Sequence, residues 1–177
     1  MRNIINDYSL STFSSITIAI RPTRMFSKNL VKVFNVFTLF NNSNIVILMD
    51  TESGLPGTCW VDKAYADYPY KKECMFNCYI SVDLLNDEFN LQKKDLDYAD
   101  IEDYFTTQLR EVSVCHIVAR ITTDNGIAIE LYADDVERII QKLNEIESDK
   151  NRLVNFNCEI YDDESWDNVS NLLIEEE

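Results

Sequence analysis

The stretch that decides the fold is "HIVARITTDNGIAIELYADDVERIIQKL", residues 116–143. Apolar side chains recur at every second position on both sides of Asn125-Gly126, which is the pattern of half-buried strands. Asn-Gly is typical of a two-residue type I′ turn, because both central residues of that turn need a positive φ. We therefore predict a β-hairpin centred on Gly126, one of only three glycines in the chain.

A helix is predicted directly after this hairpin. Asp134 or Asp135 is a suitable N-cap, since a carboxylate accepts hydrogen bonds from the first free N–H groups of a helix. The apolar residues that follow recur at helical spacing. They are Val136, Ile139, Ile140, Leu143 and Ile146.

Working outward, the same patterns predict the remaining elements. Strands are predicted at 14–20, 44–50, 75–84 and 154–161, with Phe76, Cys78, Ile80 and Val82 on one face of the third. A helix begins at Asp97 or Asp100, and a short one covers 162–173. Residues 50–57 are predicted as turns and 86–96 as a loop. Residues 27–42 have the spacing of a helix, which we predict, although their Val and Phe content equally suits a strand.

The order from residue 44 is strand, strand, helix, strand, strand, helix, strand, helix. Two amphipathic helices that bury their stripes on one face of an antiparallel sheet form an α+β, ferredoxin-like two-layer sandwich. We predict this fold for an acidic domain at 49–177. Residues 1–48 are predicted to be an N-terminal elaboration that packs on it.

The charge of the chain is uneven. Its formal net charge is −15, yet residues 1–49 contain five Lys or Arg and only one acid, Asp7. Residues 50–177 therefore have a net charge of −19. Such a field repels nucleic-acid phosphates and attracts basic proteins, although acidity also serves solubility alone.

Residues for catalysis or metal binding are sparse. The five cysteines form no CxxC pair and are interpreted as reduced, buried thiols. His116 is the only imidazole, and adjacent strand residues face opposite ways, so it does not pair with Cys115 as a base and nucleophile. We expect no cofactor, no metal site and no enzymatic activity.

Two acidic groups interleaved with aromatic residues are the candidate partner-binding site, because inhibitors of nucleases present carboxylates and rings in place of phosphates and bases. A solvated face with helix-capping acids explains much of the same pattern. The groups are Asp95, Asp97, Tyr98, Asp100, Glu102 and Asp103, and Asp162, Asp163, Glu164, Trp166 and Asp167.

Arg120 and Trp166 each have a functional and a structural interpretation, and the structural one is favoured for both. Arg120 lies in a row with His116 and Thr122, where it would anchor a ligand or pair with a carboxylate such as Glu130. Trp166 would be an exposed hot spot or a core ring.

The segments "SGLPGTCWVDKAYADYPYKKE", "IEDYFTTQL", "HIVARITTDNGIAIELYADD" and "CEIYDDESWDNVSNLL" together resemble the bacterial domain of unknown function 695 family. The resemblance covers about residues 50–173 and is carried by Arg120-Ile121-Thr122, Asn125-Gly126, Tyr132, and Asp163 with Trp166. The strand after the hairpin is poorer in aromatic residues than the family pattern. The resemblance implies no established activity, and the size and layout are distantly similar to an acidic inhibitor of a ribonuclease.

These observations predict a cytoplasmic, non-catalytic module that binds a basic protein, as an immunity protein or as an inhibitor that occludes a toxin or nuclease. The alternative is an accessory domain that self-associates through its apolar N-terminal segment, with Phe26, Phe34, Phe37 and Phe40. An enzyme is the third hypothesis. No apolar run approaches the length of about 18 residues that a membrane span needs.

Overall fold

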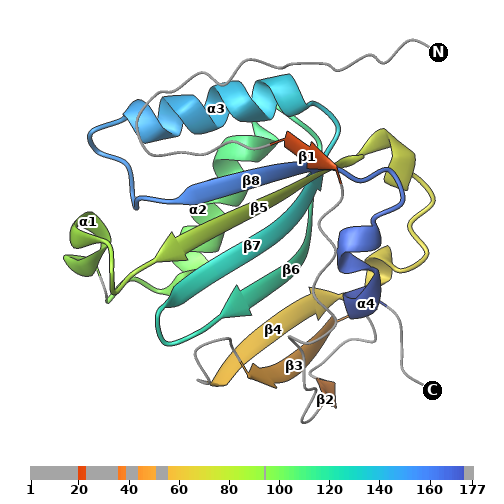
Figure 1. The fold of residues 1–177 in the computed structure, drawn as a ribbon, viewed down its shortest axis with the longest axis horizontal. Coiled ribbons are helices and arrows are strands. Elements are labelled where there is room, and N and C mark those ends of the chain that lie inside the picture. Colours follow the sequence, from red (N-terminus) through yellow and green to blue (C-terminus); the bar gives the residue numbers. More distant parts are fainter. Residues whose placement is uncertain (1–19, 23–35, 39–43, 51–55, 94, 174–177) are drawn as a thin grey trace.

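The computed structural model describes residues 20–22, 36–38, 44–50, 56–93 and 95–173. These residues form one eight-stranded sheet in the order β1-β8-β5-β7-β6-β4-β3-β2, with helices packed against it (Figure 1). The strands are β1 (Ile20–Pro22), β2 (Val36–Thr38), β3 (Asn44–Asp50), β4 (Pro56–Asp62), β5 (Phe76–Asp83), β6 (Cys115–Thr122), β7 (Gly126–Ala133) and β8 (Asn157–Asp162).

The predicted α+β class is confirmed. All neighbouring strands are antiparallel except β1, which pairs with β8 in parallel. The centre of the chain runs β5, α2 (Tyr98–Arg110), β6, β7, α3 (Val136–Ser148), β8. This order agrees with the ferredoxin-like prediction, which stays a prediction because four further strands extend the sheet.

The predicted caps of the two main helices are both present. The carboxylate of Asp97 accepts from the N–H of Ala99 at the start of α2, and that of Asp135 accepts from the N–H of Arg138 at the start of α3. These bonds satisfy N–H groups that the helix itself leaves without partners. Both helices thus begin where the sequence predicts.

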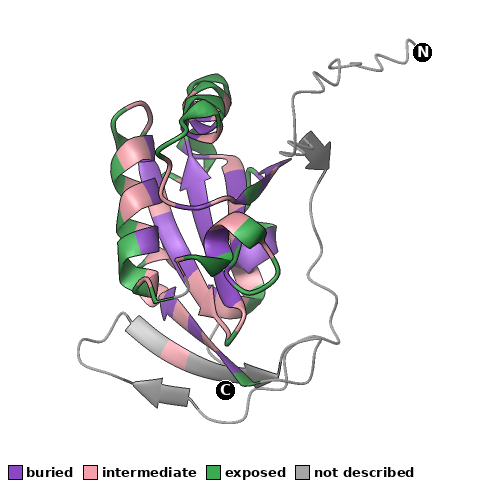
Figure 2. Cartoon of the chain, turned by 90° about the vertical axis from the view of Figure 1, so that its left-hand side faces the viewer, coloured by how far each residue is buried: buried purple, intermediate pink, exposed green. Residues whose placement is uncertain are grey.

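The first core lies between the sheet and the helices α2 and α3. Buried side chains from four strands meet the apolar stripes of the two helices, as the spacing predicts. Figure 2 shows the result as buried strands beside helices whose outer faces are exposed. The helical members of this core are Ile101, Phe105, Leu109, Ile139, Leu143 and Ile146.

A second core lies on the opposite face of the sheet. It is covered by the connection 63–75, which contains two short 3-10 helices, and by the C-terminal segment that ends in α4 (Ser170–Leu173). Its buried residues include Tyr132 and Trp166. Figure 1 shows α4 on the side of the sheet away from α2, so the prediction of helices on one face holds only for α2 and α3.

Three predicted elements need correction. Residues 56–57 belong to β4 rather than to a turn, and the prediction missed this strand entirely. The predicted loop 86–96 contains a short helix, α1 (Glu88–Leu91). Residues 36–38 of the predicted helix 27–42 form β2, which pairs with β3, so the strand preference of Val and Phe prevails there. The rest of that segment, and residues 14–19 of the first predicted strand, lie outside the described residues.

The predicted hairpin of β6 and β7 is confirmed, but the reason for its glycine is different. Neither Asn125 nor Gly126 adopts a left-handed φ, so the turn is not of type I′. Instead, a Cβ at Gly126 would lie 2.0 Å from the carbonyl oxygen of Val82 on β5. Gly126 is required because two backbones approach each other closely, not because the turn needs a positive φ.

Candidate functional site

The first predicted acidic group lies at one end of the sheet, where α2 begins. Asp95, Asp97, Asp100 and Asp103 are exposed there. Three further exposed carboxylates belong to elements that meet at this end, namely Asp83 at the end of β5, Glu88 on α1 and Asp124 in the hairpin loop. We call these seven residues the acidic end. The sequence prediction did not include Asp83, Glu88 and Asp124, because strand pairing is what brings them close to the other four.

Hydrogen bonds fix the loops of the acidic end to one another. The hydroxyl of Tyr98 donates to the carbonyl oxygen of Thr123 over 2.7 Å, and the N–H of Leu84 donates to that of Asn125 over 2.8 Å. Tyr98 is therefore half-buried and joins α2 to the hairpin. Its ring supports the surface from below, while the neighbouring carboxylates Asp97 and Asp100 are exposed to solvent.

Local contacts stabilise the charged form of two carboxylates here. Burial alone would raise the pKa of Asp83, but hydrogen bonds from Asn86 and from the N–H of Leu85 lower it below its usual value. The pKa of Asp87 is also lowered, since bonds from Asn155 and Asn90 outweigh its desolvation. Both groups are thus ionised at neutral pH.

Glu102 does not contribute a free charge to this surface. Its carboxylate pairs with the guanidinium of Arg120 at 2.5 Å, with both side chains largely covered. The predicted partner of Arg120 was Glu130. The carboxylate of Glu130 is buried and accepts a hydrogen bond from the side-chain amide of Asn77. Arg120 is therefore structural, as favoured, but it joins β6 to α2.

A β-bulge explains this change of partner. Ile117 pairs with Leu131, whereas Ala119 pairs with Glu130, so β6 has one extra residue at Val118. An extra residue reverses the face of every residue after it. His116 consequently faces the second core and Arg120 faces α2, and the predicted row that included both is wrong.

The second predicted acidic group lies at the opposite end of the sheet. Asp162 pairs with Phe76 at the start of β5, while Asp83 pairs with Gly126 at its end. Seven residue steps of about 3.4 Å separate these positions by about 24 Å. Asp162, Glu164 and Asp167 are exposed there, and Glu164 pairs with Lys72 at 2.9 Å. The two acidic groups therefore do not form one continuous surface.

Asp163 and Trp166 are not available to a partner, because their side chains are 4% and 0% exposed. Asp163 accepts from the hydroxyl of Tyr132 at 2.6 Å and from the N–H groups of Asp167 and Asn168. Trp166 stacks on Tyr132, with ring centroids 4.0 Å apart. The core interpretation of Trp166 is thus confirmed, and the two residues fasten the C-terminal segment.

His116 lies beside this core with both ring nitrogens engaged. The hydroxyl of Tyr65 is 3.3 Å from Nδ1 and that of Tyr68 is 3.0 Å from Nε2. In the neutral ring one nitrogen donates and the other accepts, and tyrosine hydroxyls serve both roles. Burial first, and then the nearby charge of Arg110, lowers the pKa of His116 below its usual value. The imidazole thus holds the connection 63–75 in place.

We predict that the stability of the protein falls as the pH is lowered from about 7 through the unfolded pKa of histidine near 6.5, until His116 titrates in the folded state. The unfolded chain binds a proton in this window that the folded chain excludes. His116→Gln is expected to flatten the dependence. Urea unfolding of both proteins between pH 7 and pH 5 measures it, and equal slopes would contradict this role of His116.

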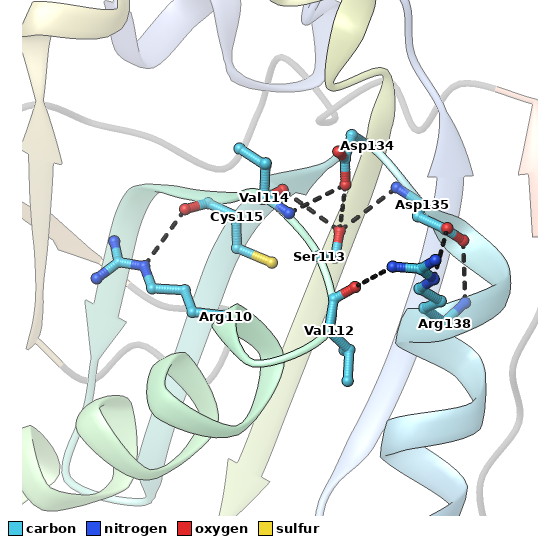
Figure 3. Close-up of a pocket in the computed structure, with 8 residues that line it drawn as sticks. All are labelled: Arg110, Val112, Ser113, Val114, Cys115, Asp134, Asp135 and Arg138. Atoms are coloured by element: carbon cyan, nitrogen blue, oxygen red, sulfur yellow. Dashed lines mark hydrogen bonds and ion pairs between the residues drawn. The ribbon is translucent and has the colours of Figure 1, made fainter.

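A pocket lies between the end of α2 and the start of α3 (Figure 3). Its volume is about 520 Å³, and it is open to solvent. Its lining residues are Arg110, Val112, Ser113, Val114, Cys115, Asp134, Asp135 and Arg138.

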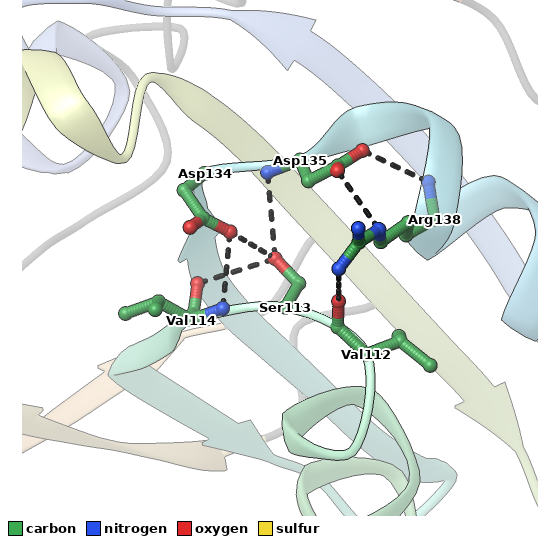
Figure 4. A network of polar contacts seen from close by, with 6 residues as sticks. All are labelled: Val112, Ser113, Val114, Asp134, Asp135 and Arg138. Atoms are coloured by element: carbon green, nitrogen blue, oxygen red, sulfur yellow. Dashed lines mark hydrogen bonds and ion pairs between the residues drawn. The ribbon is translucent and has the colours of Figure 1, made fainter.

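The polar groups of this pocket bond mainly to one another (Figure 4). Ser113 donates to the carboxylate of Asp134 at 2.6 Å, which also accepts from the N–H of Val114. Arg138 pairs with Asp135 at 3.2 Å. Ser113 therefore has an acid as its partner but no imidazole among the lining residues, and burial raises the pKa of the Cys115 thiol to about 11. This arrangement activates neither nucleophile.

The five cysteines are free and buried, as predicted. Cys74 precedes β5 and belongs to the second core, so it does not share a strand face with Cys78 of the first core. Burial raises the pKa of the Cys59 thiol to about 12, with a smaller contribution from Glu130. These thiols pack as small apolar groups.

The described ranges contain neither a candidate metal site nor a candidate membrane-spanning helix. No group of three or more His, Cys, Asp or Glu side chains there is placed to hold a metal ion. Among those same residues, no helix has the length and apolar character needed to cross a bilayer. Of the four phenylalanines proposed for self-association, Phe37 lies in β2, and the other three lie outside the described residues.

Comparisons with protein-family models, with curated proteins and with solved structures yield no match to this chain. The resemblance to the domain of unknown function 695 family therefore stays a prediction.

Proposed function

We propose that this protein is a non-catalytic module whose acidic end binds a basic protein, as an immunity protein or an inhibitor that occludes a toxin or nuclease. The observation that carries the proposal is the imbalance of surface charge. Between residues 56 and 173, residue 94 aside, seventeen Asp and Glu are exposed, against four Lys and Arg, namely Lys72, Arg110, Arg138 and Lys150.

The acidic end is the part of this surface best suited to a partner. Its carboxylates come from β5, α1, α2 and the hairpin loop, which hydrogen bonds hold together. Two described cations near α1 are engaged within the chain: Lys93 donates to the carbonyl oxygens of Arg152 and Leu153, and Arg152 donates to the side chain of Asn155. A fixed array of like charges speeds the approach of an oppositely charged protein and loses little entropy on binding.

The test is affinity capture with the full chain at low salt, from cells of the source organism. The acidic-end variant combines Asp95→Asn, Asp100→Asn, Asp103→Asn and Asp124→Asn. Asp83 and Asp97 are left unchanged because their carboxylates accept backbone N–H groups. We expect the wild type to retain a basic protein and the variant to lose it, because the attraction is electrostatic.

The matched control removes the same number of charges elsewhere, by Asp67→Asn, Glu73→Gln, Glu137→Gln and Glu145→Gln. It is expected to retain the partner as the wild type does. Addition of the captured protein's own substrate then shows whether its activity is inhibited. Equal loss of the partner by both variants would mean that net charge, and not the acidic end, governs binding.

A further inference from the structure

Side-chain hydrogen bonds fix the connection between β5 and α2, which contains the short helix α1. Asn90 on α1 is 1% exposed, and its amide donates to the carbonyl oxygens of Asp83 and Asn155. Its Oδ1 accepts from the N–H of Asn155 at 2.6 Å, and the side chain of Asn155 donates to Asp87. A four-residue helix is unstable alone, so these bonds hold α1 in its place.

This fastened connection displays apolar side chains to solvent. Leu85 is 43% exposed and Leu91 is 47% exposed, and they are two of the four large hydrophobic residues that are exposed in the described part of the chain. Single exposed leucines are ordinary, but two on one rigid element beside a carboxylate-rich surface are typical of an interface with an apolar centre and a charged rim. Glu88 and Asp95 lie on the same connection and are exposed.

The chemistry of the surface limits what binds there. The addition of a partner strand requires an open strand edge, whereas this surface consists of a loop, α1 and the first turn of α2, which offer side chains. A partner must therefore bring apolar and basic side chains together on one face. An amphipathic helix with leucine-like residues flanked by Lys and Arg does so.

We propose, on the basis of the proposed function, that the partner docks through a basic amphipathic helix. Leu85 and Leu91 contact the apolar stripe of that helix, while Glu88, Asp95 and Asp124 attract its Lys and Arg side chains. Because the connection is already ordered, the partner's helix meets a preformed surface.

The probe for this inference is a synthetic peptide of about 15 leucine and lysine residues with its leucines on one helical face. A second peptide of the same composition has its leucines dispersed. Binding of each to the full chain is measured by fluorescence anisotropy. Leu85→Ser with Leu91→Ser is expected to weaken binding of the amphipathic peptide about tenfold and to leave the dispersed peptide unaffected. Tyr70→Ser with Val114→Ser, the two other exposed hydrophobic residues, is the matched control and is expected to change neither affinity.

Circular dichroism first establishes that each variant is folded. Unchanged affinity of the leucine variant for the amphipathic peptide would overturn the helix inference. If the acidic-end variant still binds both peptides more weakly than the wild type in that case, the proposed function stands without the helix inference. If the acidic-end variant binds both peptides as tightly as the wild type does, the proposed binding surface itself is wrong.

Discussion

Replacement of Trp166 by alanine is expected to lower the free energy of unfolding by about 3–5 kcal/mol. The indole is fully buried, stacks on Tyr132 at an interplanar angle of 15°, and donates from Nε1 to the carbonyl oxygens of Lys71 and Cys74. It therefore joins the C-terminal segment, the sheet and the connection 63–75. Equilibrium unfolding in urea measures the loss.

Two controls separate packing from hydrogen bonding at this site. Trp166→Phe keeps a ring but removes the N–H, and is expected to lose less stability than Trp166→Ala. Tyr70→Ala removes an exposed ring, and is expected to change stability by no more than about 0.5 kcal/mol. A loss of less than about 1 kcal/mol in Trp166→Ala would contradict the role of this residue in the second core.

Gly126→Ala is expected to lower the free energy of unfolding by about 2–4 kcal/mol. The new Cβ would lie 2.0 Å from the carbonyl oxygen of Val82 and 3.1 Å from its carbonyl carbon. Both are backbone atoms of β5, so the clash is relieved only if the pairing of β5 with β7 shifts. Thermal unfolding followed by circular dichroism gives the change.

Asn125→Ala distinguishes this explanation from a turn that needs positive φ angles. Alanine is strained in the left-handed region, but Asn125 does not adopt it, since Trp166 is the one non-glycine residue with a positive φ in the described part of the chain. Asn125→Ala is therefore expected to change stability by about 0.5 kcal/mol or less. A loss equal to that of Gly126→Ala would favour the turn explanation.

The elements that local patterns specify were predicted well. The helices α2 and α3 combine a capping aspartate with an apolar stripe, and the hairpin of β6 and β7 combines alternation with a loop that contains Asn-Gly. Each signal arises within about a dozen residues. Packing then confirms what the local preference already favours.

The elements that depend on distant partners were missed. In β4, Pro56 and Gly57 are turn-forming residues, yet pairing with β3 makes them part of a strand. The bulge at Val118 has no local sequence signal, and it reverses the face on which Arg120 lies. The glycine at 126 was identified correctly as a hairpin signal, but its cause lies on β5.

The candidate site was predicted only in part for the same reason. Composition and spacing indicated an acidic surface, but strand register separates its two groups and brings Asp83 and Asp124 to the first. Burial of Asp163 and Trp166 follows from tertiary packing, which a sequence of alternating acids and aromatic residues does not reveal.

The most direct test of the acidic end is the salt dependence of binding to the captured partner. The wild type is predicted to lose affinity steeply between about 50 and 500 mM salt, since screening weakens attraction between exposed charges. The acidic-end variant is predicted to bind more weakly at low salt and to depend much less on salt concentration. If that variant binds as tightly as the wild type and with the same salt dependence, the acidic end is not the binding surface.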